Sequence, residues 1–275
     1  MLAVCATPIG NLEDVTLRVL RELAEADVVL CEDTRHTRGL LARHGIDARL
    51  LSYHQHNEAE RTAELVPRLA GGERVALVSD AGLPGVNDPG ARLIAAALEA
   101  GIPVTVLPGA SAVETALVAS GLAGERYQFL GYMPRGAKAL GELWAGLAAW
   151  PFPAIAFESP KRLPATLRSL ADAAPERPVA VCRELTKRFE EVVRGTPAEL
   201  AERFAEPPKG EITLVLGGAE PVASGAQEAA ALELALGAVS ELLAAGLPRR
   251  QAADIVARLT RNSRNTLYRE SLQSD

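Results

Sequence analysis

Turns rich in glycine and proline follow several short apolar runs of the chain, where the strands of a parallel sheet would end. There are four: Thr7–Asn11, Ser79–Val86, Pro108–Ser111 and Gly131–Pro134. In open α/β sheets, ligands bind outside the carboxyl ends of the strands, and glycine there lets backbone N–H and C=O groups reach a ligand directly. A single loop of this kind needs such residues merely to turn. Four of them together favour a small-molecule site.

The residues of these turns also narrow the class of ligand. The first turn does not match GxGxxG, and GxxxxGK[ST] occurs nowhere in the chain, which disfavours a nicotinamide dinucleotide or ATP. No Lys or Arg stands among the glycines, so a polyphosphate is disfavoured as well. Backbone groups and apolar side chains suit a ligand with an adenine, a ribose, a carboxylate and a cationic centre. S-adenosylmethionine is such a ligand, and its sulfonium needs neither an acid nor a metal to activate the methyl group.

A charged segment follows the apolar run Val179–Cys182. Glu184 and Lys187 stand three residues apart in it, between Arg183 and Arg188. A carboxylate beside cations could take a proton while its neighbours hold phosphates; the alternative is a solvated charged loop.

The four histidines all lie within residues 36–56, but they lack cysteine partners or an HExxH helix, so no metal site is predicted.

Strand-like and helix-like patterns alternate between the turns in the first part of the chain. The expected strands are Leu2–Ala6, Val28–Cys31, Val75–Val78 and Val104–Leu107, and the expected helices are 16–25, 34–44, 57–70 and 89–100. Asn57 followed by Glu60 predicts a capping-box-like start, and Pro89 is expected at a first helical position. This alternation predicts βα units and a mostly parallel sheet.

A break near residues 120–124 separates this part from a second series of strands and helices. Its expected strands are Tyr127–Gly131, Ala154–Phe157, Val179–Cys182 and Ile212–Leu216, with helices near 138–148, 161–173 and 197–205. Small and polar residues then indicate a linker. Residues 231–245, 248–260 and 264–272 predict three helices. We therefore expect an α/β domain at 1–119, a second α/β domain at 120–217, a linker at 218–230 and a helical module at 231–275.

Composition and charge are those of a folded protein with a basic tail. The 275 residues are 48% hydrophobic and 23% charged, and the net charge is −6. The last 29 residues hold six Arg against three acidic residues, so this tail carries +3 and the remainder −9. The tail predicts either a helix-turn-helix-like module or an amphipathic cap, so total charge does not exclude nucleic acid. No run approaches the roughly 20 apolar residues of a membrane span, no signal peptide is visible, and three scattered cysteines fit reduced thiols. The expected location is the cytoplasm.

A series of motifs resembles one protein family in order along the chain. They are Ala6–Thr16, Cys31–Thr37, Ser52–Glu58, Ser79–Pro89, Pro108–Ser111, Gly131–Arg135, Glu158–Pro160, Arg183–Lys187 and Lys209–Thr213. The chain thereby resembles the small-subunit ribosomal RNA methyltransferase I family, a branch of the tetrapyrrole methylase superfamily. The loops carry the resemblance to the superfamily. Glu-Asp-Thr-Arg, Tyr-His-Gln-His-Asn-Glu and Arg-Glu-Leu-Thr-Lys carry the resemblance to the branch, since a tetrapyrrole enzyme is not expected to have them.

The resemblance implies two α/β domains with S-adenosylmethionine in the cleft between them, in a homodimer. It implies methylation of the ribose 2′-hydroxyl of a decoding-centre cytidine (1402 in rRNA numbering) in 16S rRNA of the small ribosomal subunit. Donor-site residues carried over from the family are Ile9, Leu83, Val86, Ser111, Ala112 and Met133, with Thr213 near the last strand. Loop-shaping residues are Pro8, Gly10, Asp80 and Gly82. With this resemblance, Glu184 and Lys187 are the expected catalytic groups.

The same strand-end loops supply the candidates for contact with RNA. Tyr53 or His54 could stack on a flipped-out base, although hydrogen bonding in a surface loop explains them equally. The expected phosphate contacts include Arg35, Arg38, Arg135, Arg183 and Arg188, together with Arg43 and Lys187. Two other functions stay open: a C-methyltransferase acting on a tetrapyrrole such as a corrin precursor, and a non-catalytic ribosome-assembly factor that binds RNA.

Overall fold

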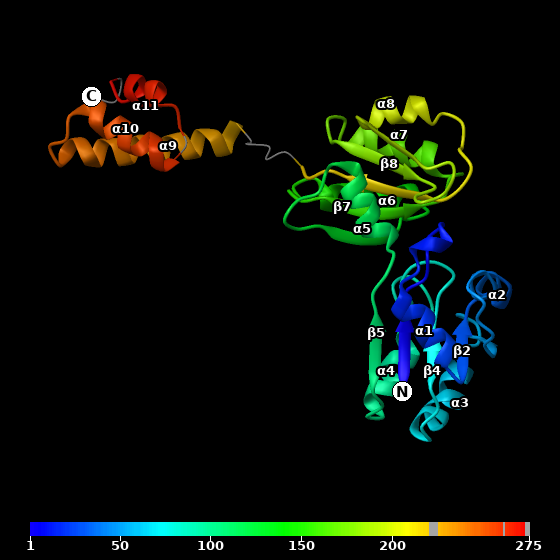
Figure 1. Cartoon of the computed structure of the whole chain (residues 1–275). Coiled ribbons are helices and arrows are strands. Elements are labelled where there is room, and N and C mark those ends of the chain that lie inside the picture. The colour runs from blue at the N-terminus through cyan, green and yellow to red at the C-terminus, as the bar shows by residue number, and fades with distance from the viewer. Residues whose placement is uncertain (220–224, 261, 273–275) are drawn as a thin grey trace. The chain divides into compact units, whose positions relative to one another are not determined.

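The computed structural model describes residues 1–219, 225–260 and 262–272 (Figure 1). They form two compact units, Met1–Ala219 and Glu220–Asp275. Part of the expected linker at 218–230 and the end of the tail lie outside the described residues. Within the described part of the chain, no helix has the length and apolar character needed to cross a membrane.

The first sheet is parallel throughout, as the alternating pattern predicts. Its strand order is β3-β2-β4-β1-β5. The strands are β1 (Leu2–Cys5), β2 (Val28–Cys31), β3 (Leu50–Ser52), β4 (Val75–Leu77) and β5 (Val104–Leu107), and the helices between them are α1 (Leu17–Glu25), α2 (Thr34–Arg43), α3 (Glu58–Ala70) and α4 (Ala91–Glu99). A 3-10 turn, η1 (Leu12–Asp14), follows the first strand. Strand β3 was not predicted; its three residues are too few to show a pattern.

Both faces of this sheet are buried because successive side chains of a strand point to opposite sides. Leu2 and Val4 of β1 join one apolar cluster with residues of α3 and α4, whereas Ala3 and Cys5 join another with residues of α1 and α2. Two expected helix starts differ from the observed ones. Asn57 makes no cap hydrogen bond to α3, and Pro89 stays in the loop before α4.

The second sheet is mixed, unlike the first. Its order is β6-β7-β10-β8-β9, and only the β6–β7 pair is parallel. The elements are β6 (Gln128–Tyr132), α6 (Ala137–Leu147), β7 (Ala154–Glu158), α7 (Leu163–Ala173), β8 (Val179–Arg183), β9 (Glu191–Gly195), α8 (Pro197–Arg203) and β10 (Ile212–Leu216). The unpredicted strand β9 forms a hairpin with β8, and this hairpin reverses the direction of the chain.

The chain passes from one sheet to the other earlier than the predicted boundary at 119/120. Helix α5 (Ala112–Ser120) was not predicted and follows β5 directly. Its Val113, Ala116 and Leu117 pack with Ile155, Val215 and other residues of the second sheet. The crossing is therefore the Pro108–Ser111 turn, and α5 covers a face of the second sheet.

The second unit contains α9 (Gly225–Ala244), α10 (Arg249–Thr260) and α11 (Arg264–Glu270). Helix α9 begins earlier than the expected residue 231. Ala235, Val239, Ala253, Val256 and Leu267 form a small core among the three helices. The unit thus has its own apolar core.

Candidate functional site

A cavity of about 760 Å³ lies in the first unit, within the range of small-molecule sites. The turns after β1, β4 and β5 contribute to it, as do residues of the second sheet. Its lining includes Ile9, Asp80, Gly82, Leu83, Val86, Asp88, Gly109, Ser111, Ala112, Tyr132, Glu158, Leu185, Glu211 and Thr213. Lining groups are mostly apolar side chains and turn backbone, with several carboxylates. This composition fits a ligand that combines a flat apolar ring with a cationic centre.

Backbone contacts between the turns set the wall of the cavity. Thr7 N donates to Gly82 O at 2.8 Å, and Gly82 N donates to Thr7 O at 3.1 Å. Gly82 has φ +79°, a left-handed conformation that glycine adopts without steric cost. A Cβ on Gly109 would lie 2.8 Å from the Cβ of Ala6, so the Pro108–Ser111 turn also needs glycine for close packing.

The structure brings together most of the expected donor-site residues. Those that line the cavity are Ile9, Asp80, Gly82, Leu83, Val86, Ser111, Ala112 and Thr213. Pro8, Gly10 and Met133 are not among the lining residues. Met133 is 2% exposed and packs in the core of the second sheet. A Cβ on Gly10 would lie 2.4 Å from Cγ of Lys187, so Gly10 allows two loops to approach closely.

The two expected catalytic residues pair with each other beside the cavity rather than lining it. Lys187 Nζ donates to Glu184 Oε1 and to Glu211 Oε2, both at 2.9 Å. Glu184 Oε1 also accepts from Glu211 N. The hydrogen bond from Lys187 lowers the pKa of Glu184. Burial alone would lower the pKa of Lys187, but its bonds to Glu211 and Glu184 raise it. A base needs the opposite shifts, so this arrangement argues against proton transfer by either group.

The residues expected to contact RNA fall into three environments. Arg35, Arg38, Arg135 and Arg188 are exposed, as a phosphate contact requires. Arg183 is partly buried, and its Nε donates to Glu191 Oε2 at 3.0 Å. His54 is partly buried, and its ring lies edge-on to that of His56.

Tyr53 is buried, so the expectation that it stacks on a base is wrong. Its side chain is 1% exposed, and its hydroxyl contacts Glu58 Oε1 at 3.2 Å and Thr62 Oγ1 at 3.1 Å. Glu58 Oε1 also accepts from Gly90 N at 3.0 Å. The Tyr53–Glu58 pair therefore anchors the end of the Ser79–Gly90 loop, which lines the cavity.

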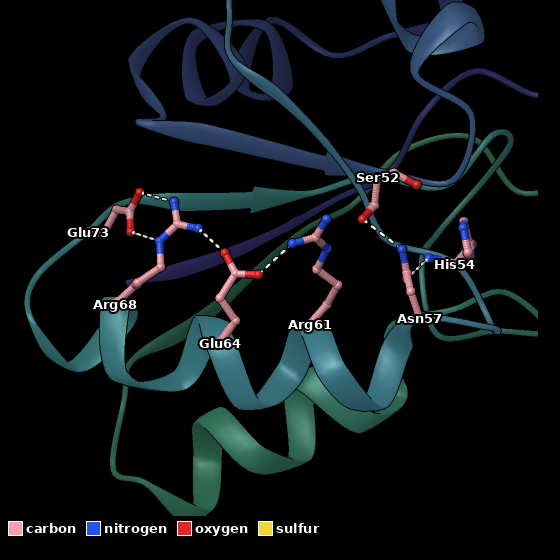
Figure 2. Close-up of polar contacts among 7 residues, drawn as sticks. All are labelled: Ser52, His54, Asn57, Arg61, Glu64, Arg68 and Glu73. Atoms are coloured by element: carbon pink, nitrogen blue, oxygen red, sulfur yellow. Dashed lines mark hydrogen bonds and ion pairs between the residues drawn. The ribbon is translucent and has the colours of Figure 1, made fainter.

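A second set of contacts holds the segment between β3 and α3 (Figure 2). Asn57 donates to Ser52 O at 3.1 Å and accepts from His54 N at 2.8 Å, so its side chain points back along the segment instead of capping α3. Farther along α3, Glu64 pairs with Arg61 and Arg68, and Arg68 pairs with Glu73. The Ser52–Glu58 motif is thus held by hydrogen bonds within the segment, and these support the position of Glu58 at the start of α3.

Glu58→Ala is expected to weaken binding of S-adenosylmethionine several-fold, because Gly90 N and the Tyr53 hydroxyl lose a charged acceptor worth about 1.5–3 kcal/mol. Titration calorimetry measures the change in donor Kd. Glu60→Ala, an exposed change on the same helix, is the control and should leave Kd unchanged. Equal donor affinity in the two variants would show that the anchor does not position the loop.

Several cavity residues were not expected from the sequence. Asp88, Tyr132, Glu158 and Glu211 line the cavity, and all four belong to motifs quoted for the family without an assigned role. Among the described residues, no group of three or more His, Cys, Asp or Glu side chains is arranged to hold a metal ion. The three cysteines are buried free thiols, and burial raises the pKa of Cys5 and Cys182 to about 12.

Comparison with known families identifies the class of protein that carries this cavity. The family model for tetrapyrrole (corrin/porphyrin) methylases matches residues 1–201. The chain belongs to the tetrapyrrole methylase family. Its α/β fold is the one expected from the sequence. This methylase is also similar in structure to the uroporphyrin-III C-methyltransferase of Thermus thermophilus, with a TM-score of 0.56, 25% identity, and coverage of 79% of this chain and 94% of that one.

Curated relatives place this methylase in one branch of the family. It is 45% identical to the Ribosomal RNA small subunit methyltransferase I of Mesorhizobium japonicum, over 99% of this chain and 91% of the relative. The protein of the same name from a Synechocystis strain is 43% identical, over 99% of this chain and 98% of the relative. The predicted membership of the ribosomal RNA methyltransferase I family is therefore confirmed.

Proposed function

We propose that this methylase transfers the methyl group of S-adenosylmethionine to the ribose 2′-hydroxyl of the decoding-centre cytidine 1402 in 16S rRNA. The observation that carries the proposal is the 45% identity, across nearly the whole chain, to a protein named for ribosomal RNA small subunit methylation. The cavity supports it, because its mixture of apolar walls, turn backbone and carboxylates suits a sulfonium ligand.

The residues of the cavity suit the task of holding the donor. Ile9, Leu83 and Val86 offer apolar surface to an adenine ring, and the Gly82 and Gly109 turns expose backbone groups. The carboxylate of Asp80 favours a positive charge in the cavity by Coulomb attraction. When bound, S-adenosylmethionine supplies an activated methyl group. The chain must then bring the hydroxyl to about 3–3.5 Å from that methyl, in line with the sulfur.

Methyl transfer to small ribosomal subunits tests the proposal. Subunits of 30S from cells that lack the gene are incubated with tritiated donor, and the product is mapped by nuclease digestion and mass spectrometry. One 2′-O-methyl group on the decoding-centre cytidine is the expected result. Transfer to a corrin precursor instead would assign the tetrapyrrole reaction. Donor binding with no transfer to any acceptor would favour an assembly factor.

A basic groove beside Gly10 is our candidate for the RNA backbone. Arg43, Lys187 and Arg188 line it together with residues of the first turn and with Glu13, which pairs with Arg43 at 3.6 Å. Lys187 is held there by Glu184 and Glu211, so we assign the Glu184–Lys187 pair to shaping this groove rather than to proton transfer. The exposed Arg35, Arg38 and Arg135 remain proposed phosphate contacts.

Arg188→Ala is expected to lower the affinity for 16S rRNA and to reduce the slope of log K against log salt by about 1, because one phosphate contact is lost. Filter binding across a salt series measures both quantities. Arg92→Ala removes the same charge from the exposed surface of α4 and should leave the slope unchanged. An unchanged slope for Arg188→Ala would remove the groove from the RNA interface.

We also propose that the protein acts in the cytoplasm and forms a homodimer, the homodimer being what the family resemblance implies. Val106 on the edge strand β5 is 51% exposed and Val118 on α5 is 74% exposed, which leaves apolar surface for a second copy to cover. Light scattering of the purified chain measures the mass directly.

A further inference from the structure

The proposed reaction needs a group that takes the proton of the ribose hydroxyl, and the cavity offers a small set of carboxylates for it. Five acidic side chains line the cavity: Asp80, Asp88, Glu114, Glu158 and Glu211. Because the base must lie within hydrogen-bond reach of the attacking hydroxyl, a lining carboxylate is a better candidate than the Glu184–Lys187 pair.

Four of these carboxylates already accept hydrogen bonds or pair with a cation in the structure. Glu211 accepts from Lys187, and Glu158 pairs with Arg162 at 2.6 Å. Glu114 accepts from the Ser111 and Tyr127 hydroxyls, and Asp80 accepts from Asp33 N at 3.2 Å. These contacts give each of the four groups a partner within the protein.

Asp88 differs from the other four carboxylates. Within the described residues, neither a Lys or Arg side chain nor a backbone N–H binds its carboxylate, and its one hydrogen-bonding neighbour is the Ser79 hydroxyl. The side chain is partly buried and lines the cavity. A carboxylate with this setting is available to a ligand group.

The backbone around Asp88 is held in an uncommon conformation. Asn87 has φ +61° although it is not glycine, and Gly90 has φ +138°. Gly90 is fixed by Glu58, as described above. The Asn87 amide lies 3.3 Å from the position of a Cβ on Gly131, in the turn after β6. Contacts on both sides of Asp88 therefore define where its carboxylate lies.

The surroundings of Asp88 favour a proton on it more than water does. Burial is the main cause and the Glu32 carboxylate adds to it; together they raise the pKa of Asp88 to about 6. Asp80 acts in the same direction, and the Ser79 hydroxyl opposes it. Tyr132 also lies near these carboxylates. Burial is the main cause that raises the pKa of its phenol, and the charge of Asp88 is the next. A pKa near the working pH is what a general base requires.

We propose that the Asp88 carboxylate accepts the proton of the ribose 2′-hydroxyl during methyl transfer. This rests on the function proposed above. As the C–O bond forms, the C–S bond breaks and its electron pair stays on sulfur, so the sulfonium becomes a neutral thioether. The hydroxyl proton passes to Asp88, and the product is a neutral methyl ether. Charge balances because one cation and one carboxylate are neutralised together.

Single-turnover methylation of 30S subunits by Asp88→Asn and Asp88→Glu variants tests this role. We expect D88N to lower the rate about 10²–10⁴-fold, with donor Kd from calorimetry changed by less than about threefold. The wild-type rate should rise as pH increases through 6 and then level, since the base works when deprotonated. D88N should lose that rise, and D88E should keep it at an intermediate rate. Asp172→Asn, the same change on the exposed surface of α7, is the control and should behave like wild type.

Each other outcome decides against a specific statement. A D88N rate equal to that of wild type would overturn the role of Asp88. Loss of donor binding in both D88N and D88E would also overturn it, because the carboxylate would then hold the donor instead. If wild-type protein methylates no cytidine in 30S subunits, the proposed function itself fails, and this result is independent of the variants.

Discussion

Glu158→Ala is expected to lower the free energy of unfolding by about 3–5 kcal/mol, the usual effect of removing one partner of a buried ion pair. The Glu158 side chain is fully buried, and it pairs with Arg162 at 2.6 Å. It also accepts from Ser159 N and from the Thr166 hydroxyl. Without it, the Arg162 guanidinium stays partly buried with no charged partner.

The same change should also affect the cavity. Arg162 donates to Met133 O at 3.0 Å and to Pro134 O at 2.9 Å, so it holds the turn after β6 beside the donor site.

Urea unfolding followed by circular dichroism measures the stability change. Glu142→Ala, which removes the exposed partner of Lys138, is the control and should cost less than about 1 kcal/mol. Similar losses in both variants would mean that the buried pair contributes no more than a surface pair.

Gly82→Val is expected to weaken donor binding by about tenfold or more. Gly82 has φ +79°, and a residue with a Cβ pays roughly 1–2 kcal/mol in that conformation. The new Cβ would lie 3.8 Å from Ala110 O and 3.9 Å from Cγ2 of Ile9, so the rest of the side chain takes space at the cavity wall. A loss of 1.4 kcal/mol corresponds to a factor of about ten in Kd.

Calorimetric titration with S-adenosylmethionine measures this loss, and thermal unfolding checks that the variant is folded. Gly141→Ala is the matched control: Gly141 lies in α6 with no atom within 4 Å of an added Cβ. It should keep wild-type affinity. If folded Gly82→Val binds the donor as tightly as wild type, the turn after β4 is not part of the donor site.

Local patterns in the sequence determined the strands and helices that have strong signals of their own. Buried strands such as Val28–Cys31 and amphipathic helices such as α3 were predicted close to their observed bounds, because hydrophobic periodicity is a local property. The turns that line the cavity were predicted for the same reason, since glycine and proline mark strand ends. The family resemblance also came from short sequence motifs, both in these turns and in segments such as Arg183–Lys187.

Pairing of distant segments was decided only by the tertiary structure. Strand β9 exists because it pairs with β8, and β10 runs antiparallel to both of its neighbours. Helix α5 is apolar on most sides and covers the second sheet, so its sequence has little amphipathic signal. None of these relations can be deduced from periodicity within one segment.

The site shows the same division between local and long-range information. Eight expected donor residues line the cavity, and six of them stand in the predicted turns; Ala112 begins α5 and Thr213 lies on β10. The charged residues 183–188 suggested a catalytic role from the sequence. In the structure, Lys187 forms ion pairs with Glu184 and with Glu211. Tyr53 is polar at its tip and buried by packing. The pKa of Asp88 depends on burial, on Glu32 at the end of another strand and on Asp80 of its own loop. Residue types and turns were thus determined by the sequence alone, whereas burial, pairing and proton affinity depend on side chains brought together by folding.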